Sequence, residues 1–265
     1  MLREPCVSGK FYPQDPSELE SMIMSFEEWS QTKATVKGIV VPHAGYMYSG
    51  KVAASVWGKI NVPETVIIIA PNHTGLGPSI SVYPEGQWVT PLGNIEIDTA
   101  LSKAIVSGSG LAEADTLAHK NEHSVEVQLP FMRLANPLAK LVAIVMGDYS
   151  EFAILDLSKA IFEHANPDKT LIVASSDFSH YEPEYTAKAR DKFAIEEIKK
   201  LDWRALHNVV TTKEISMCGL GPICVAIECS KRWNAESGKL LSYSNSGFMS
   251  HDFSNVVTYA AMAFK

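Results

Sequence analysis

Residues 65–73 read Thr-Val-Ile-Ile-Ile-Ala-Pro-Asn-His, a short apolar run that stops at a proline and is followed by a histidine. The run is rich in β-branched side chains and has no alternating polar positions. This pattern is typical of a strand that is buried on both faces, as in a parallel sheet covered by helices on each side. Three more runs share the pattern, at residues 38–41, 141–145 and 170–174. We therefore expect a central sheet with a parallel portion.

Candidate helices and further strands surround these runs. Helical spacing and start signals predict helices over residues 50–59, 99–107, 122–135, 150–165, 183–200, 202–209 and 223–233. Later or smaller strands are predicted over residues 239–244 and 255–264, and over a pair formed by 81–83 and 95–97. The alternation predicts the α/β class, with a central mixed sheet flanked by helices. Because no repeat or long linker divides the chain, we expect a single domain over residues 1–265.

The charge and hydropathy patterns exclude several classes of protein. The 265 residues carry 23 Lys and Arg against 30 Asp and Glu, a net charge of -7, which argues against a nucleic-acid partner. The apolar runs are far shorter than the ~20 residues that a membrane helix needs. The first residues, Met1 to Pro5, contain no apolar stretch of signal-peptide length. We therefore expect a cytoplasmic protein with no membrane partner.

Polar residues follow three of the predicted strands. His43 comes after the run at 38–41, His73 follows the opening run, and Asp177 follows the run at 170–174, with His180 three residues further on. Open α/β sheets bind ligands beyond the carboxyl ends of their strands, where loops converge on a rigid support. A single histidine is more often structural than functional, but the shared placement favours a metal site at His43 and His73.

The cysteines leave two interpretations open. Cys6, Cys218, Cys224 and Cys229 contain no Cys-x-x-Cys pair, which weighs against a zinc ribbon or a thioredoxin-type site. Cys218 precedes a predicted helix, where backbone dipoles favour a thiolate that can act as a metal ligand or nucleophile. The alternative is a small buried apolar residue, which is our interpretation of Cys224 and Cys229.

Residues 119–123, His-Lys-Asn-Glu-His, match a metalloprotease pattern. In inverzincins, His-x-x-Glu-His places both histidines on one helix face. A protease also needs a downstream carboxylate ligand, and the sequence singles out none. We therefore interpret His123 and Glu122 as residues beside the strand ends that face a substrate or support the ligands. Glu126 is interpreted as support for its helix.

Six groups of residues, in order along the chain, carry a resemblance to a known family. They are Arg3–Pro5 with Gly9–Pro13, Pro42–Tyr46 with Tyr48–Gly50, Pro71–Gly75, Glu122–Phe131, Ser176–Tyr181 and Cys218–Gly219. On these residues the chain resembles the Memo family, whose members look like class III extradiol dioxygenases of the LigB type. Those enzymes use non-haem iron and have a sheet flanked by helices, so the resemblance implies a LigB-like α/β domain.

The resemblance also implies a site and its contents. Carried over by motif, His43, His73 and Cys218 are the metal ligands, and His180, Asp177 and His123 are catalytic candidates in the same pocket. The implied metal is iron first and copper second, with zinc as a further option. Relatives are described as metal-binding redox proteins and as binders of phosphorylated peptides. Their gene neighbourhoods imply pathway partners of the radical-SAM and AMMECR types.

Two positions depart from the family pattern. LigB-type enzymes complete their iron site with a carboxylate, whereas this chain has Cys218, a softer ligand that shifts the preference toward copper(I), zinc or thiolate-bound iron. Many relatives have Arg after the Cys-Gly pair, but this chain has Leu220, which removes a cation that could hold an anionic substrate.

Two functions are consistent with these residues. The first is a metal-dependent oxidoreductase in which His180 acts as general acid or base. Asp177 then either orients His180 or completes the outer shell of the metal. The second is a binding module for a peptide or small molecule without turnover, in which Tyr46, Tyr48 and Tyr181 provide an aromatic lining.

Overall fold

The computed structural model describes residues 1–26, 29–30 and 32–265. Its main sheet contains β2 (Gly38–Val41), β3 (Thr65–Pro71), β4 (Ile80–Val82), β7 (Ala112–Ala114), β8 (Lys140–Met146), β9 (Thr170–Ser175), β10 (His180–Glu182), β11 (Gly238–Asn245) and β12 (Val256–Phe264). A small second sheet contains β1 (Leu2–Arg3), β5 (Gln87–Trp88) and β6 (Ile95–Glu96).

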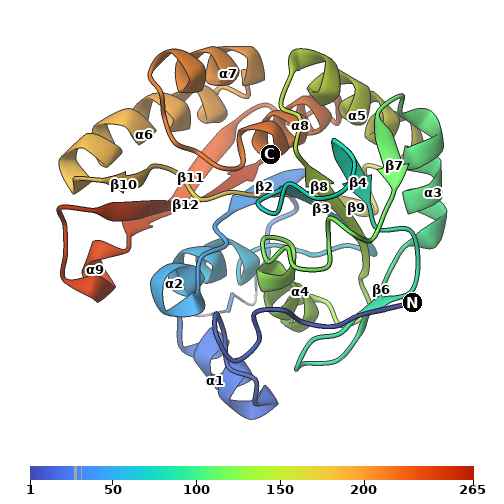
Figure 1. Ribbon diagram of the computed structural model, residues 1–265, viewed down its shortest axis with the longest axis horizontal. Helices are drawn as coiled ribbons and strands as arrows, with labels where there is room; N and C mark the ends of the chain where they lie inside the picture. Colours follow the sequence, from blue (N-terminus) through green and yellow to red (C-terminus); the bar gives the residue numbers. More distant parts are fainter. Residues whose placement is uncertain (27–28, 31) are drawn as a thin grey trace.

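The main sheet is mixed. Its strand order is β10-β12-β2-β9-β3-β8-β4-β7, and β11 pairs with β12 (Figure 1). The central strands β2, β9, β3 and β8 run parallel to one another, whereas β12 and β4 pair antiparallel with β2 and β8. The α/β class with a mixed central sheet is therefore confirmed.

Helices cover both faces of this sheet (Figure 1). On one face lie α1 (Pro16–Phe26), α2 (Tyr46–Trp57) and α4 (Leu129–Ala135). On the other face lie α3 (Thr99–Gly108), α5 (Glu151–His164), α6 (Glu184–Lys199), α7 (Trp203–Thr212) and α8 (Leu220–Arg232). A hydrophobic core lies between the sheet and the helices on each side, and alternate residues of β3 belong to each core. Val66 and Ile68 pack on the side of α1, α2 and α4, and Ile67 and Ile69 pack on the opposite side. This double burial explains why the strand has no polar positions.

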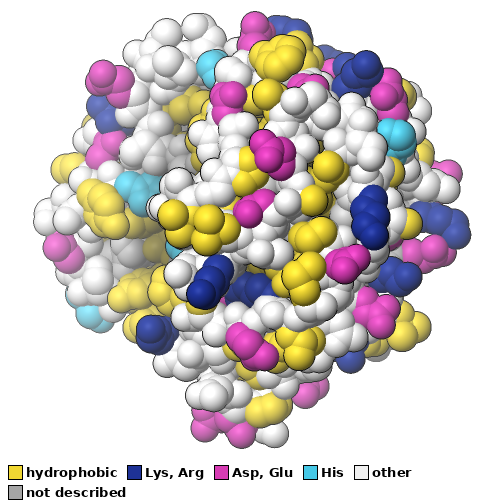
Figure 2. Space-filling view, turned by 45° about the vertical axis from the view of Figure 1, so that its right-hand side comes forward, with side chains coloured by type: hydrophobic (Ala, Val, Ile, Leu, Met, Phe, Trp, Pro, Cys, Tyr) yellow, Lys and Arg dark blue, Asp and Glu magenta, His cyan; other side chains and the backbone are white. Residues whose placement is uncertain are grey.

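Two smaller features lie outside these layers. The short helix α9 (Gly247–Ser250) lies between β11 and β12 along the chain, and the 3-10 turn η1 (Glu126–Gln128) leads into α4. Within the described residues, no helix is long and apolar enough to cross a membrane. On the face shown in Figure 2, Lys and Arg side chains are interspersed with acidic ones and form no stripe.

Two sequence predictions were wrong. Residues 122–125 are not helical, because Glu122 accepts hydrogen bonds from the backbone amides of Ser124 and His73, and the helix begins at Leu129 next to a proline at its first turn. The predicted pair of 81–83 with 95–97 does not form. Instead, the buried β4 pairs with β7 and β8 in the main sheet, and β6 pairs with β5.

The protease interpretation requires a helix over residues 119–123, and the structure has none there. Residues 119–123 are not helical, so His119 and His123 do not share a helix face. His119 is fully buried and packs edge-on against Tyr83 and Trp88. The two histidines of the motif therefore have separate surroundings.

Candidate metal centre

The candidate site lies at the carboxyl ends of three adjacent strands. His43 comes two residues after β2, His73 two residues after β3, and Asp177 two residues after β9. Because β9 lies between β2 and β3 and all three are parallel, their carboxyl ends meet at one edge of the sheet. The structure thus brings these three residues together from distant parts of the chain.

Cys218 reaches the same edge from the segment that precedes α8. Its Sγ atom lies 3.2 Å from Nε2 of His43. Potential ligand atoms of His43, His73 and Cys218 all lie within 4.8 Å of one another. Two imidazole nitrogens and a sulfur suit iron, copper or zinc better than a hard cation such as magnesium. The donor set and its spacing therefore fit a transition-metal ion.

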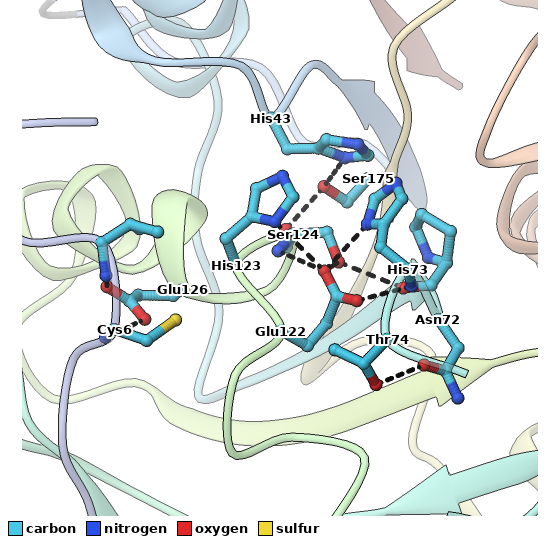
Figure 3. A network of polar contacts seen from close by, with 12 residues as sticks. Cys6, His43, Asn72, His73, Thr74, Glu122, His123, Ser124, Glu126 and Ser175 are labelled. Carbon is cyan, nitrogen blue, oxygen red and sulfur yellow. Dashed lines mark hydrogen bonds and ion pairs between the residues drawn. The ribbon is translucent and has the colours of Figure 1, made fainter. Parts of the chain in front are cut away.

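His123 completes a cluster of three imidazoles. Its ring centroid lies 5.0 Å from that of His73 and 5.5 Å from that of His43, and the other two centroids are 5.1 Å apart. Figure 3 shows the three rings gathered around a common space, with Glu122 reaching toward them. Potential ligand atoms of His73, Glu122 and His123 also lie within 4.8 Å of one another. His123 therefore stands directly beside the proposed ligand set.

Glu122 is the buried acceptor that orients His73. Its carboxylate accepts the Nδ1–H of His73 at 2.9 Å, the backbone amide of His73 at 2.6 Å and the hydroxyl of Ser124 at 2.8 Å. Burial raises the pKa of Glu122, but the hydrogen bond and charge of His73 and the bonds from Ser124 outweigh it and lower the pKa to about 2. Because an ionised carboxylate only accepts, Nδ1 of His73 carries a proton, and in the neutral ring Nε2 keeps the lone pair that can bind a ligand.

Glu122→Gln is expected to weaken metal binding by about 10–100-fold, the usual effect of losing the outer partner of a ligating histidine. The amide can present an N–H to Nδ1 and so favour the wrong tautomer of His73. Competition titration with a chromophoric zinc chelator measures the change in affinity. An unchanged affinity in the folded variant would show that Glu122 does not orient His73.

Burial keeps His43 neutral. Its side chain is almost fully buried, and desolvation together with the neighbouring charges of His123 and His73 lowers its pKa well below the usual value. Neutral imidazole is the form that binds a metal. His43 can therefore act as a ligand at physiological pH without first losing a proton.

Asp177 and His180 supply proton-holding groups beside the cluster. The Asp177 carboxylate accepts the backbone amide of His43 at 2.8 Å, and burial raises its pKa to about 6. His180 lies 2.7 Å through Nδ1 from the carbonyl oxygen of Ser216, which only accepts. Nδ1 of His180 is therefore the protonated nitrogen, and Nε2 is the one available to a bound molecule. The carbonyl of Ser216, and not the Asp177 carboxylate, therefore contacts Nδ1 of His180.

Of the two interpretations left open for Cys218, the thiolate is not favoured in the metal-free chain. Burial and the charge of Asp177 raise the pKa of the Cys218 thiol, and the hydrogen bond from the backbone amide of Asp177 at 3.2 Å does not offset them. A bound metal ion reverses this balance, because a coordinating thiol loses its proton. The side chain of Leu220, two residues after Cys218, is buried in the hydrophobic core.

A cavity of about 660 Å³ opens above the cluster. Its polar residues are Lys10, His43, His73, His123, Asp177, His180, Ser216 and Cys218, and its aromatic residues are Phe11, Tyr48, Tyr181 and Tyr259. Tyr46 was expected in this lining, but it is buried in the core, where its hydroxyl donates to the carbonyl of Val127 at 2.6 Å. Phe11 was missed, although its ring packs edge-on against His123 at 5.0 Å. Only the Gly9–Pro13 motif of the family resemblance pointed to that segment.

Comparison with solved structures supports the fold. The chain is similar to the crystal structure of an uncharacterized protein from Escherichia coli K12, with a TM-score of 0.56 and 12% identity. The match covers 85% of this chain and 99% of that one.

Comparison with known sequences gives closer relatives. The chain is 40% identical over 281 residues to a MEMO1 family protein of Methanopyrus kandleri, covering 100% of this chain and 99% of the relative. It is 42% identical over 283 residues to a MEMO1 family protein of Desulfurococcus amylolyticus, covering 99% and 98%. A family description, Memo-like protein, matches residues 3–263. With nearly the whole length matched in each case, this chain belongs to the Memo family.

Proposed function

We propose that this protein is a metal-dependent oxidoreductase whose metal is held by His43, His73 and Cys218. The observation that supports the proposal is the approach of two imidazoles and one thiol to within 4.8 Å at the floor of an open cavity. Iron is the first candidate and copper the second, since sulfur and nitrogen donors suit both. Such a metal supplies one-electron chemistry and, where a coordination position faces the cavity, activation of dioxygen.

The surrounding residues give the site its proton chemistry. Nε2 of His180 accepts a proton from a bound hydroxyl group and returns it later. Asp177 holds or releases a proton near neutral pH, because its pKa is raised to about 6. Phe11, Tyr48 and Tyr259 form apolar walls that displace water from a bound molecule.

Anaerobic reconstitution tests the proposal. We expect wild type to bind one equivalent of Fe(II) or Cu(I), and His43→Ala/His73→Ala to bind neither. His164→Ala, an exposed histidine at the end of α5, serves as the matched control and should bind as wild type does. Equal, negligible binding by wild type and the double variant would end the proposal.

The second candidate is a binding module that uses the same cavity without turnover. It is favoured by the thiol at the position where dioxygenases of this type have a carboxylate, and by the aromatic walls. Oxygen consumption by metal-loaded protein with a panel of catechols separates the two functions. Turnover supports the oxidoreductase, whereas ligand binding without oxygen uptake supports the module.

A further inference from the structure

Nδ1 of His43, the ring nitrogen that does not face Cys218, points into the protein and contacts one hydroxyl group. Nδ1 of His43 lies 2.9 Å from Oγ of Ser175, the last residue of β9. A neutral imidazole has one donor nitrogen and one acceptor nitrogen, so this contact can run in either direction. The direction decides which nitrogen carries the lone pair that faces Cys218.

The other contacts of Ser175 decide the direction. Its hydroxyl donates its single hydrogen to the carbonyl oxygen of Ser124 at 2.7 Å, and a carbonyl can only accept. Nε2 of Gln128 lies 3.1 Å from the same Oγ and donates to it. With its hydrogen already used, Oγ of Ser175 has only a lone pair left for His43.

The orientation of the Gln128 amide is fixed independently. Its Oε1 lies 3.3 Å from Nε1 of Trp57, and an indole N–H only donates. Its Nε2 lies 2.7 Å from the carbonyl oxygen of Pro42, which only accepts. Exchanging the amide oxygen and nitrogen would break both contacts. Trp57, Gln128, Ser124 and Ser175 are all fully buried, so water cannot substitute for a lost partner.

We propose that Ser175 is a positioning residue that acts through His43. With Gln128 and Ser124 fixing its hydroxyl, Ser175 accepts the Nδ1–H of His43 and leaves the lone pair of Nε2 facing Sγ of Cys218, 3.2 Å away. The proposal rests on the metal-binding function above, because the bare Nε2 is the atom that would bind the ion. The inference also extends that function, since His43 and His73 then donate to two different acceptors, a neutral hydroxyl and the Glu122 carboxylate. Ser124 links the two acceptors, because its carbonyl accepts from Ser175 and its hydroxyl donates to Glu122.

This arrangement has a physical rationale. A carboxylate behind His43 would place a further negative charge close to Asp177 and a metal-bound sulfur in a buried setting. A hydroxyl that is already committed as a donor selects the same tautomer without adding charge. The neutral acceptor therefore suits the buried His43, and the charged acceptor suits His73, which is partly exposed.

The tautomer is measurable in the metal-free protein. Long-range proton–nitrogen correlation spectra of protein labelled with 15N-histidine distinguish the two neutral tautomers, and the His43 signals are those missing from His43→Ala. We expect wild type to show the Nδ1–H form. We expect Ser175→Ala to shift His43 toward the Nε2–H form, because Nε2–H can then donate to the sulfur of Cys218.

Zinc affinity provides the second readout. Ser175→Ala is expected to bind Zn(II) about 10–100-fold more weakly than wild type, as for other outer partners of ligating histidines. Ser102→Ala removes an equally buried serine hydroxyl in α3 that finds no hydrogen-bond partner among the described residues, and should leave both readouts unchanged. An Nε2–H form in wild type, or an unchanged tautomer and zinc affinity in Ser175→Ala, would overturn the inference. If the tautomer shifts as expected but wild type binds no metal, the inference stands and the metal-binding function fails.

Discussion

Glu126→Gln is expected to lower the free energy of unfolding at pH 7 by about 3–5 kcal/mol, the usual cost of removing one partner from a buried ion pair. Glu126 is fully buried and pairs with the guanidinium of Arg3, which is only 4% exposed. The substitution conserves size but leaves the Arg3 charge without a counterion in an apolar setting. The other acceptors of Arg3 are the carbonyls of His119 and Glu122 and the thiol of Cys6, which are uncharged at pH 7 and do not neutralise that charge.

The loss extends to the segment that leads to the cavity. Glu126 also accepts hydrogen bonds from the backbone amides of Cys6 and Val7 and from the hydroxyl of Tyr12. These contacts hold the segment in which Phe11 packs against His123. We therefore expect the variant to loosen one wall of the cavity as well as the fold.

Urea denaturation followed by circular dichroism measures the change in free energy. Glu85→Gln is the matched control, because Glu85 pairs with Lys103 on the surface, where both side chains are more than half exposed. Removing such a pair changes stability by about 1 kcal/mol or less. A loss for Glu126→Gln no larger than that of the control would refute the assigned role of the Arg3–Glu126 pair.

The effect also depends on pH in a defined direction. Burial raises the pKa of Glu126, but the charge of Arg3 and the bonds from Arg3, Cys6 and Val7 outweigh it, so the folded-state pKa lies below the unfolded value. The stabilisation is therefore complete above the unfolded pKa of about 4.3 and is lost as pH falls through the folded value. The difference between wild type and Glu126→Gln should be constant from pH 6 to 8 and shrink below about pH 4. A difference that grows in acid would contradict this sign.

The central sheet was predictable because its sequence signal is local. In β3 each residue is buried, alternately in one core and the other, so the run shows no polar positions and ends visibly at Pro71. Its carboxyl end then located His73, and the same logic located His43 and Asp177. Strand order was not needed for this step, because parallel strands of one sheet share the edge at which they end.

The roles of Glu126, Tyr46 and Cys218 could not be predicted, because they depend on contacts and burial that involve distant segments of the chain. Glu126 was interpreted as helix support because nothing near it in sequence indicates that Arg3 is its partner, 123 residues away. Tyr46 was expected to line the cavity, but its side chain turns into the core and Phe11 takes that place. The protonation of Cys218 depends on burial, which neighbouring residues in the sequence do not reveal.

Gly219→Ala is expected to cost about 3 kcal/mol of stability, the upper part of the usual range for overpacked cores. A Cβ atom at this position would lie 2.4 Å from Cβ of Ser176 and 2.5 Å from the backbone oxygen of Ser175. Neither atom belongs to the end of a flexible side chain, so the segment before α8 must move away from β9. Thermal unfolding should show the loss. Gly147→Ala provides the control, because the nearest atom of the described residues to a Cβ at position 147 is the backbone oxygen of Ser79 at 3.7 Å.

The same displacement should weaken metal binding, because the close packing at Gly219 holds Cys218 at the proposed metal site. Gly219 follows Cys218, and its amide donates to Oγ of Ser176 at 3.0 Å, so the close approach at position 219 places the sulfur beside His43. Movement by the width of a methyl group takes Sγ out of a coordination sphere shared with the two histidines. We therefore expect Zn(II) affinity to fall at least about 10-fold in Gly219→Ala, as when an outer partner of a ligand is lost. If stability falls while zinc affinity stays at the wild-type value, Cys218 is not a ligand, because no other proposed ligand lies on the displaced segment.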